Sequence, residues 1–497
     1  MAAAASAGAR LATSYVPRPY RATTVPSAYE LHVVKRLGCG YSRGTLASIR
    51  ALGGITPWLN HQLNPASVPE APIVASIDSW FSDLRRTPAQ KAYSNQNGGK
   101  EAWQYGLDLQ NWTLLRRVHS NRTVLETMVD FWTNHLHVST EHDLAWAHQA
   151  NYDQMIRRHA LGKFDDLLVA ASTHPAMSLY LDNWRSVKDA PNENQGRELL
   201  ELHTVGVDAG YTEDMVKDSA VLLSGYSVDW GDTYDGFYDS ANHTTGAVSV
   251  LGFTHANASS DGRAATEAYL RYLAHHPATA RTLARRMAVR FVHDDPSADL
   301  VQHIASAFTA SGTDIKATLR AMIAHPEFRA SAGQKVFTPV DDMVATLRVL
   351  GVTPKAPTSE ESFANAVNWV HGGLAPYSWP RPDGAPETND EWTTAVRVTR
   401  SFEMHWNLAG AWWPTEAVTY VAPRYRIPAA RIRFDQLVDH LSRSLLGRGS
   451  TARMLRSACI ATGLTPASVI TRTHEVATWK FPWLAAVFLD SPDHMSR

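Results

Sequence analysis

The stretch APNENQGRELLELHTVG, residues 190–206, has the pattern of a helix that combines acidic groups with leucines. On a helix, Asn194, Glu198 and Glu201 follow the spacing i, i+4, i+7 and therefore share one face. The neighbouring leucines predict that much of this helix is buried. Two buried carboxylates repel each other and need a proton, an arginine or a metal cation between them. The stretch therefore predicts a helix and a polar site together.

Stretches with the same apolar periodicity lie on both sides of this one, and strand signals are few. Ser42 is a predicted N-cap for the helix that follows it. The fold class predicted from this pattern is all-α. The expected helices lie at 30–38, 43–52, 57–63, 101–134, 143–172, 193–206, 212–225, 264–292, 297–311, 314–324, 338–350, 361–370, 390–410, 434–446, 451–462 and 479–489.

Two segments interrupt the helical pattern. Residues 226–255 are rich in Gly, Asp, Ser and aromatic residues, which predicts a long irregular insertion with a β-hairpin. The second segment is rich in Pro and Gly and begins at residue 372. We expect a flexible lead-in at 1–28, a main helical body at 29–371, and a linker with C-terminal helices of the same unit at 372–497.

The composition excludes several classes of protein. The 497 residues include 47 Lys and Arg and 48 Asp and Glu, a formal net charge of -1, so no basic footprint for a nucleic acid is present. No uninterrupted apolar run is long enough for a membrane span. The N-terminus has no recognisable export signal, which favours the cytoplasm. The only cysteines, Cys39 and Cys459, form neither a disulfide framework nor a zinc motif. A protein partner is compatible with this composition, and the small-molecule substrate is unknown.

The order of motifs resembles the DUF1800 family, a large bacterial group of unknown function. Its hallmark is the Asn-Glu-Asn, Arg-Glu-Leu, Glu-Leu run found here at 192–202, and the likeness extends from about residue 29 to 490. The resemblance implies no particular reaction, although many relatives are exported. Further matching pieces are FWTNH at 131–135, YTE at 211–213, LSGY at 223–226, HPATAR at 276–281, HPEF at 325–328 and WPRPDG at 379–384.

Four positions depart from the family pattern. Thr133 stands where the family has His, and Thr244 where it has Asp. Met215 replaces an Asp and Val221 an Arg. If these residues are ligands in relatives, this chain has a lost or altered site.

One interpretation of the polar stretch is a metal-dependent enzyme. Glu198 and Glu201 would bind a metal together with His135 and His243, with His203 or Asn194 as further candidates. Carboxylate and imidazole ligands from neighbouring helices suit iron, manganese or zinc. The di-iron Glu-x-x-His signature is absent, because residue 204 is Thr. The cofactor itself is unknown.

The same interpretation gives two further residues a role. Glu193 would be an acid/base group and Arg197 would orient the carboxylates. Their i, i+4 spacing also favours an ion pair. Whether the chemistry is redox or hydrolytic is open, and a metal-free acid/base pair is a third version.

The alternative is a non-enzymatic structural or interaction protein. Arg197 with Arg157 or Arg158 would then neutralise the carboxylates in a buried ion-pair network, and the Trp-rich C-terminal third would bind a partner. Most tryptophans are interpreted as core anchors. The arginine-rich stretch 424–433 is interpreted as a solvated face and not as a phosphate site.

Overall fold

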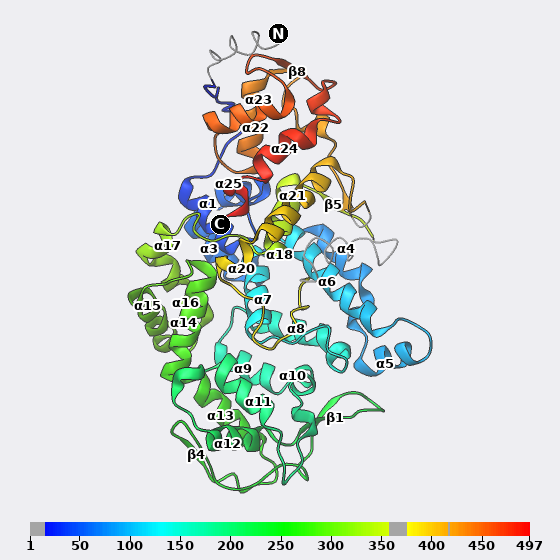
Figure 1. The fold of residues 1–497 in the computed structure, drawn as a ribbon. Coiled ribbons are helices and arrows are strands. Elements are labelled where there is room, and N and C mark those ends of the chain that lie inside the picture. Colours follow the sequence, from blue (N-terminus) through cyan, green and yellow to red (C-terminus); the bar gives the residue numbers. More distant parts are fainter. Residues whose placement is uncertain (1–14, 357–374, 416–417) are drawn as a thin grey trace, which may run out of the picture.

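The computed structural model describes residues 15–356, 375–415 and 418–497. The described chain is mostly helical with small two-stranded sheets, so the predicted all-α class is confirmed. The molecule is elongated, with the C-terminal helices at the top of Figure 1, the N-terminal helices in the middle and residues 160–275 at the bottom. The helix expected at 361–370 and the domain boundary at 371/372 lie outside the described residues, and the division into domains stays a prediction.

The first part of the chain forms the middle of the molecule. Ser42 accepts a hydrogen bond from the Thr45 N–H and begins α2, which confirms the predicted cap. Ser27 and Glu30 form a reciprocal capping box that begins α1. The helices are α1 (Ala28–Leu37), α2 (Arg43–Ala51), α3 (Ile55–Gln62), α4 (Pro72–Trp80), α5 (Pro88–Gln96), α6 (Ala102–His119), α7 (Thr123–His135) and α8 (Gln149–His159).

The next helices form the lower part and one side of the molecule (Figure 1). Several of them have proline at the first helical position, where the missing N–H costs no hydrogen bond. They are α9 (Phe164–Ser172), α10 (Pro175–Tyr180), α11 (Glu193–Glu198), α12 (Glu213–Leu223), α13 (Arg263–His275), α14 (Pro277–Phe291), α15 (Ala298–Ala310), α16 (Ile315–Ala324) and α17 (Pro326–Ala330).

The predicted insertion contains two antiparallel hairpins. β1 (Tyr226–Val228) pairs with β2 (Gly236–Tyr238), and β3 (Val248–Val250) pairs with β4 (Phe253–His255). In the first hairpin Ser227 is opposite Phe237, and in the second Ser249 is opposite Thr254. The irregular, hairpin-containing character of 226–255 is therefore as predicted, with one more hairpin than expected.

The C-terminal helices pack on the upper end of the middle part. Two short sheets join them: β5 (Thr353–Pro354) pairs with β6 (Val418–Thr419), and β7 (Arg431–Arg433) with β8 (Val469–Thr471). The helices are α18 (Pro339–Leu350), α20 (Asn389–Trp392), α21 (Ala395–Gly410), α22 (Phe434–Leu445), α23 (Ala452–Thr462), α24 (Phe481–Leu489) and α25 (Pro492–Met495).

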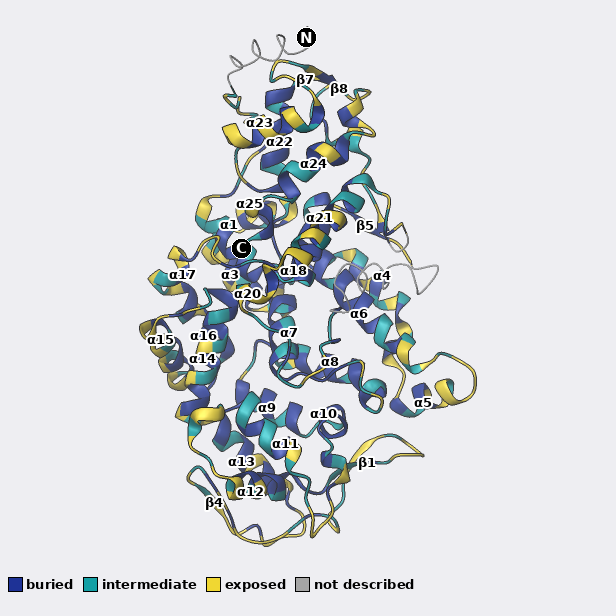
Figure 2. Ribbon diagram, viewed as in Figure 1, coloured by how far each residue is buried: buried dark blue, intermediate teal, exposed yellow. Residues whose placement is uncertain are grey.

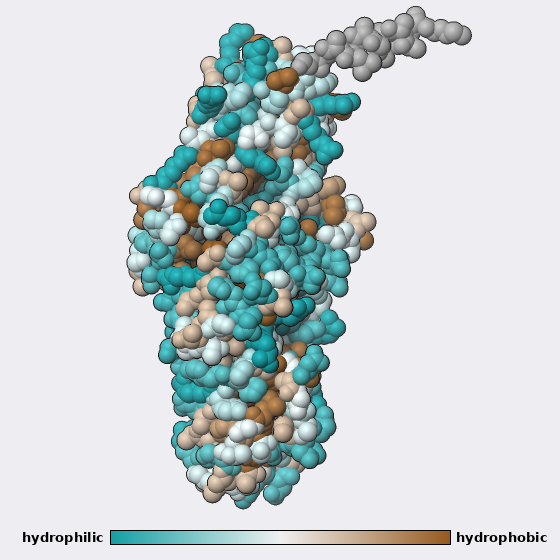
Figure 3. Space-filling model, turned by 90° about the vertical axis from the view of Figure 1, so that its left-hand side faces the viewer, coloured by the Kyte–Doolittle hydropathy of each residue, from teal (hydrophilic) through white to brown (hydrophobic). Residues whose placement is uncertain are grey.

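Two hydrophobic clusters form the core. One unites residues from α1 to α3 and from α7 to α17, and the other unites residues of α4, α6 and α8 with α18 and the C-terminal helices. Buried residues follow the middle of the molecule, and exposed residues lie on the outer faces of helices such as α15 (Figure 2). The face in Figure 3 is mostly hydrophilic, with hydrophobic side chains gathered in places along it. Among the described residues, no helix combines the length and apolarity that crossing a membrane requires.

Candidate functional site: an arginine-lined cleft

The predicted helix at 193–206 is shorter than expected and changes its winding. α11 ends at Glu198, and Leu199–His203 continue as a π-helical turn, η6. Arg197 lies 3.6 Å from Glu193 on the same helix, so the predicted ion pair is confirmed. Arg197 also makes a two-pronged contact with Glu213 of α12, at 2.6 and 2.9 Å. This guanidinium therefore joins two helices at the surface of the molecule.

The two predicted carboxylate ligands lie on either side of the change in winding. Burial and the neighbouring Glu201 charge raise the pKa of Glu198. Glu201 lies 3.8 Å from Arg197, and its side chain is about one quarter exposed at 26%. Leu199 and Leu200 are buried, as the sequence predicts, but the acidic face is only partly covered. The two carboxylates are thus at the edge of the core.

His135 is fully buried at the end of α7, against the π-turn. Its Nε2 bonds to the carbonyl of His203 at 3.1 Å, and the two rings are 6.4 Å apart. Burial lowers the pKa of both rings, so both are neutral at pH 7. His135 Nδ1 and His203 Nε2 are buried and have no hydrogen-bond partner.

His243 lies in the insertion and is buried among polar groups. Its Nδ1 contacts Ser224, and its Nε2 contacts the Asn257 side-chain oxygen at 2.9 Å. Both ring nitrogens are therefore engaged by residues that flank the insertion. The roles assigned to His135, Glu198, Glu201 and His243 as metal ligands, and to Glu193 and Arg197 in catalysis, stay predictions.

A different group brings three metal-type donor atoms within 4.8 Å of one another in the part of the chain that the structure describes: Asp342, His405 and His494. His405 contacts Asp342 through Nε2 at 3.2 Å and Asp490 through Nδ1 at 2.8 Å. Burial opposes a charge on His405, yet the two carboxylates raise its pKa to about 9. The protonated ring thus bridges two acids, and Arg397 adds a further positive charge beside Asp342. These groups satisfy one another as an ion-pair network.

The two threonines among the departures from the family pattern are also engaged locally. The Thr133 hydroxyl donates to the Val129 carbonyl at 2.9 Å. The Thr244 hydroxyl donates to the Lys188 carbonyl, and its N–H to Ser224 Oγ at 2.9 Å.

A cleft of about 930 Å³ lies at the level of the N-terminal helices. Its walls come from α2, α3, the turn between α6 and α7, the end of α18 with the residues up to Val352, the segment 421–428 that includes η8 (Pro423–Arg426), and α22. Tyr20, Ala22 and Thr23 also line it. We call it the arginine cleft, after Arg43, Arg348 and Arg426 in its lining. Its volume is within the range of small-molecule sites.

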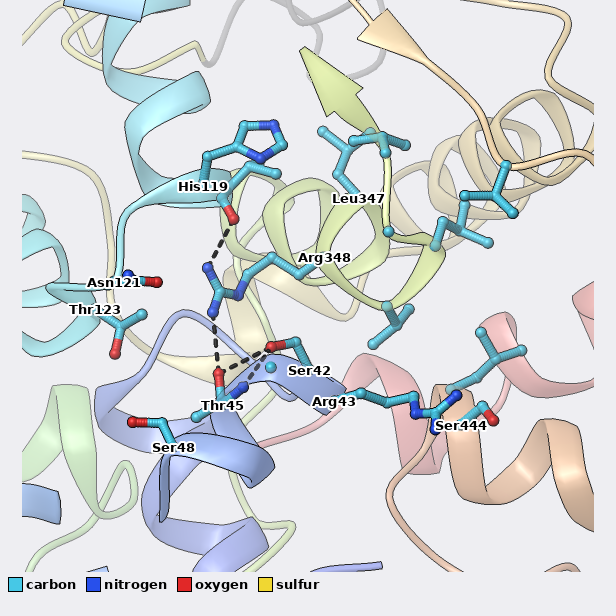
Figure 4. A pocket seen from close by; sticks show the side chains of 18 of the residues that line it. Ser42, Arg43, Thr45, Ser48, His119, Asn121, Thr123, Leu347, Arg348 and Ser444 are labelled. Atoms are coloured by element: carbon cyan, nitrogen blue, oxygen red, sulfur yellow. Dashed lines mark hydrogen bonds between the residues drawn. The ribbon is translucent and has the colours of Figure 1, made fainter. Parts of the chain in front are cut away.

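Arg348 is the central cation of the arginine cleft (Figure 4). Its Nη1 donates to the carbonyls of Arg117 and Val118, and its Nη2 donates to Thr45 Oγ1 at 3.2 Å. The Thr45 hydroxyl also contacts Ser42 Oγ at 2.9 Å. Burial lowers the pKa of Arg348 below its usual value, since every partner is uncharged.

Arg426 also has an uncharged partner. Its guanidinium donates to the Leu350 carbonyl, and burial lowers its pKa to about 10, so it still carries its charge at pH 7. Arg43, at the first turn of α2, is exposed. None of these three arginines has an ion-pair partner among the residues described here.

The described lining of the cleft contains no Asp or Glu. Glu70 lies just behind it and accepts the Ser120 hydroxyl, but Arg116 and Arg122 neutralise that carboxylate. His119 beside Arg348 is neutral at pH 7, since burial and the arginine charge lower its pKa to about 4. The cleft therefore carries an uncompensated positive charge.

Buried polar atoms without a partner cluster in the same lining. Native proteins leave few such atoms unpaired, because each one costs free energy. Water or a ligand has to satisfy them. They are Arg348 Nε, His119 Nε2, Thr123 Oγ1 and Ser444 Oγ.

The sequence gives little sign of this cleft, because its residues are spread from Tyr20 to Leu445. The interpretation of the stretch 424–433 as a solvated face holds for the exposed Arg424 and is wrong for Arg426. The Arg426 guanidinium donates to the Leu350 carbonyl of α18 and is therefore half-buried, although the surrounding sequence is typical of a surface. No local spacing signals that contact.

Fold and cleft together define an all-α protein with a cationic cleft. The family model described as "Protein of unknown function (DUF1800)" matches residues 32–496. The chain therefore belongs to the DUF1800 family, and the predicted resemblance is confirmed. No curated protein and no solved structure matches the chain.

Proposed function

We propose that this protein binds an anionic small molecule in the arginine cleft. The observation that carries the proposal is the pair of half-buried guanidiniums, Arg348 and Arg426, in a lining whose described residues include no carboxylate. Withdrawing a charge from water is costly unless an opposite charge compensates it. A bound anion supplies that opposite charge from outside the chain.

Calorimetric titration of inorganic phosphate into the full chain tests the proposal. We expect binding to the unaltered protein and a loss of at least about tenfold in affinity in Arg348→Gln, because a charged hydrogen bond is worth roughly 1.5–3 kcal/mol. Arg424→Gln is the matched control, since Arg424 is exposed and outside the lining. Equal weakening by both variants, or no binding of phosphate, sulfate or a carboxylate to any of the three proteins, would overturn the proposal.

A metal-dependent enzyme is the second candidate function. It would use His135, Glu198, Glu201 and His243 as ligands for iron, manganese or zinc. Glu193 would act as an acid/base group, and Arg197 would orient the carboxylates. The unpartnered nitrogens of His135 and His203 favour it, since a metal would satisfy buried imidazole groups of this kind. The π-turn is a second supporting feature, because such turns are frequent at functional sites.

Elemental analysis of protein purified without chelator tests this second candidate. We expect near-stoichiometric iron, manganese or zinc in the unaltered protein and none in Glu198→Ala, with the variant still folded. Absence of metal from both proteins would rule out the hypothesis of a metal-dependent enzyme. It would favour the structural alternative, in which Arg197 and its acidic partners serve only to join helices.

The remaining expectations from the sequence stay predictions. They are a cytoplasmic location, a protein partner, and the absence of a nucleic-acid partner.

A further inference from the structure

A second, smaller cavity lies where α6, α7, α14 and the first turn of α18 meet the segment 375–392. We call it the Glu387 pocket. Its volume is about 100 Å³, and its described lining shares no residue with that of the arginine cleft. A protein cavity of about 150 Å³ can hold benzene, which has six heavy atoms, so a molecule of about four heavy atoms fits this pocket.

Asn134 of α7 holds Glu387 in a fixed position. The side-chain amide of Asn134 donates to the Ala385 carbonyl and to Glu387 Oε1, both at 2.9 Å, and its oxygen accepts from the Ala385 N–H at 2.7 Å. Gly384 has a φ of 75°, and an added Cβ there would collide with the Asn134 carbonyl oxygen. The segment therefore lies directly against α7, and one carboxylate oxygen of Glu387 is already occupied.

The charges in the Glu387 pocket balance one another. Each arginine in its described lining has a carboxylate partner within 4 Å, and each carboxylate has an arginine partner. The pairs are Arg117 with Asp130 at 2.9 Å, Arg290 with Asp130 at 2.7 Å, Arg157 with Glu126 at 2.7 Å, and Arg290 with Glu387 at 3.7 Å. A ligand of this pocket therefore needs no net charge.

Hydrogen bonding in the same lining is incomplete. Arg290 Nε and Glu387 Oε2 are buried and have no hydrogen-bond partner among the described residues. Both side chains are more than nine-tenths buried, and the two atoms lie 3.7 Å apart, which is too long for a hydrogen bond. Native proteins leave few such atoms unpaired. A group that accepts from Arg290 and donates to Glu387 would satisfy both atoms.

A primary carboxamide has these two functions and no charge. Its carbonyl oxygen is an acceptor, and its NH₂ group, on the same carbon atom, is a donor. A carboxylate lacks the donor and adds a negative charge, whereas an ammonium group lacks the acceptor and adds a positive charge.

The apolar part of the lining favours an organic ligand over water. A buried water typically makes about three hydrogen bonds, and the two atoms of Arg290 and Glu387 supply two. Val129, Val340 and Trp392 also line the pocket, and their side chains would contact the alkyl part of an amide.

We infer that the Glu387 pocket binds a small primary carboxamide. Its carbonyl oxygen accepts from Arg290 Nε, and its NH₂ group donates to Glu387 Oε2. Its alkyl part lies against the apolar side chains of the lining. This site is separate from the proposed anion site and does not depend on it.

Calorimetric titrations of acetamide, acetone and acetate into the full chain, each at millimolar concentration, test this ligand class. The three probes have the same number of heavy atoms and nearly the same shape. Acetone lacks the N–H donor, and acetate lacks it and also carries a charge. We expect acetamide to bind at least about tenfold more tightly than either, because the other two leave Glu387 Oε2 buried and unpaired.

Glu387→Gln and Glu391→Gln are a matched pair of variants. In Glu387→Gln, the side-chain oxygen keeps its bond from Asn134, so an NH₂ group replaces the acceptor that faces the ligand. We expect acetamide to lose its advantage over acetone in this variant. Glu391 is exposed and outside the described lining, so Glu391→Gln should keep the advantage of about tenfold.

Val340→Phe fills the pocket and leaves its ion pairs in place. Val340 is only partly buried, so the protein should accommodate the larger side chain and stay folded. We expect acetamide to bind at least about tenfold more weakly. Phosphate binding in the arginine cleft should be unchanged, because the two described linings share no residue.

Acetone or acetate binding as tightly as acetamide would overturn the carboxamide class. Unchanged acetamide binding in both Glu387→Gln and Val340→Phe would overturn the placement of the ligand. If none of the three probes binds to the unaltered protein, the pocket holds only water and the inference fails. None of these results bears on anion binding in the arginine cleft, which the phosphate titrations test.

Discussion

Arg348 and Asp341 lie seven residues apart in sequence, near opposite ends of α18, and their surroundings differ sharply. Asp341 is buried and contacts three guanidiniums: Arg117 at 2.5 Å, Arg497 at 2.9 Å and Arg290 at 3.2 Å. These arginines hold the pKa of Asp341 far below its usual range, although burial alone would raise it. Arg348 contacts only carbonyls and a hydroxyl. The protein thus surrounds Asp341 with opposite charges and gives Arg348 only uncharged partners.

Asp341→Asn should therefore be strongly destabilising. The variant leaves three buried arginines without their shared counter-charge, and we expect the free energy of unfolding to fall by about 3–5 kcal/mol. Asp214→Asn is the control, because the Asp214 side chain is 89% exposed and its pair with Lys217 contributes little. Urea denaturation of the three proteins measures both effects. A loss below about 1 kcal/mol in Asp341→Asn would contradict the assignment of Asp341 as the shared counter-charge of the three arginines.

The sequence could predict local charge pairs but not this contrast. The ion pair between Glu193 and Arg197 follows from i, i+4 spacing alone. The partners of Asp341 come from α6, α14 and residue 497, and those of Arg348 come from α2 and the end of α6. Such sets form only when distant elements pack, so no spacing in the chain signals them.

At the scale of elements, α11 and α12 approach each other closely at one glycine. A Cβ on Gly196 would lie 2.8 Å from the backbone nitrogen of Ala220 and 3.1 Å from the Val216 carbonyl oxygen. Both neighbours are backbone atoms of α12 and cannot move independently. The Arg197–Glu213 contact holds the same two helices together at the surface.

A pair of Gly→Ala variants should therefore change stability in opposite directions. Gly196→Ala pushes α11 away from α12, and we expect it to lower the free energy of unfolding by about 1–3 kcal/mol. Gly44→Ala adds a methyl group to open space within α2, where Ala is the better helix former, and should gain about 0.5–1 kcal/mol. Urea denaturation of both variants compares the two effects. Equal effects of the two substitutions would contradict the prediction that the close approach of α11 and α12 excludes a side chain at residue 196.

Most helices of the described chain could be predicted at this scale, and the end of α11 could not. The stretch 193–206 keeps a helical pattern of leucines to the end, which gives no sign of a π-turn at Leu199–His203. The wider turn accompanies the packing of His203 against His135, a contact between residues 68 positions apart in sequence. Tertiary packing overrode the local pattern there.

At the scale of the whole molecule, buried neutral histidines make stability depend on pH. Burial lowers the pKa of His32, His148 and His440 to about 4 and that of His203 to about 3. In the unfolded chain each titrates near 6.5, so between pH 6.5 and 4 the unfolded state binds more protons than the folded state. Their contribution to stability is therefore present above pH 6.5 and is lost as the pH falls toward 4.

The free energy of unfolding should thus decrease between pH 6.5 and 5, by up to roughly 1.4 kcal/mol per pH unit for each such histidine. His405 has the opposite sign, because its raised pKa of about 9 gives stability that is fully present below pH 6.5 and is lost as the pH rises from 6.5 through 9. Urea denaturation at half-unit pH steps checks both directions. A free energy of unfolding that stays constant from pH 7 to 5 would contradict the assignment of neutral buried rings.

The central claim is that the arginine cleft holds an oxyanion, and a crystal structure of the protein with tungstate tests it most directly. Tungstate is a tetrahedral oxyanion whose position appears in anomalous density. We expect a peak in the arginine cleft, within hydrogen-bond distance of Arg348 or Arg426, that is absent from Arg348→Gln crystals. Tungstate bound elsewhere on the molecule, with none in the cleft, would contradict the account.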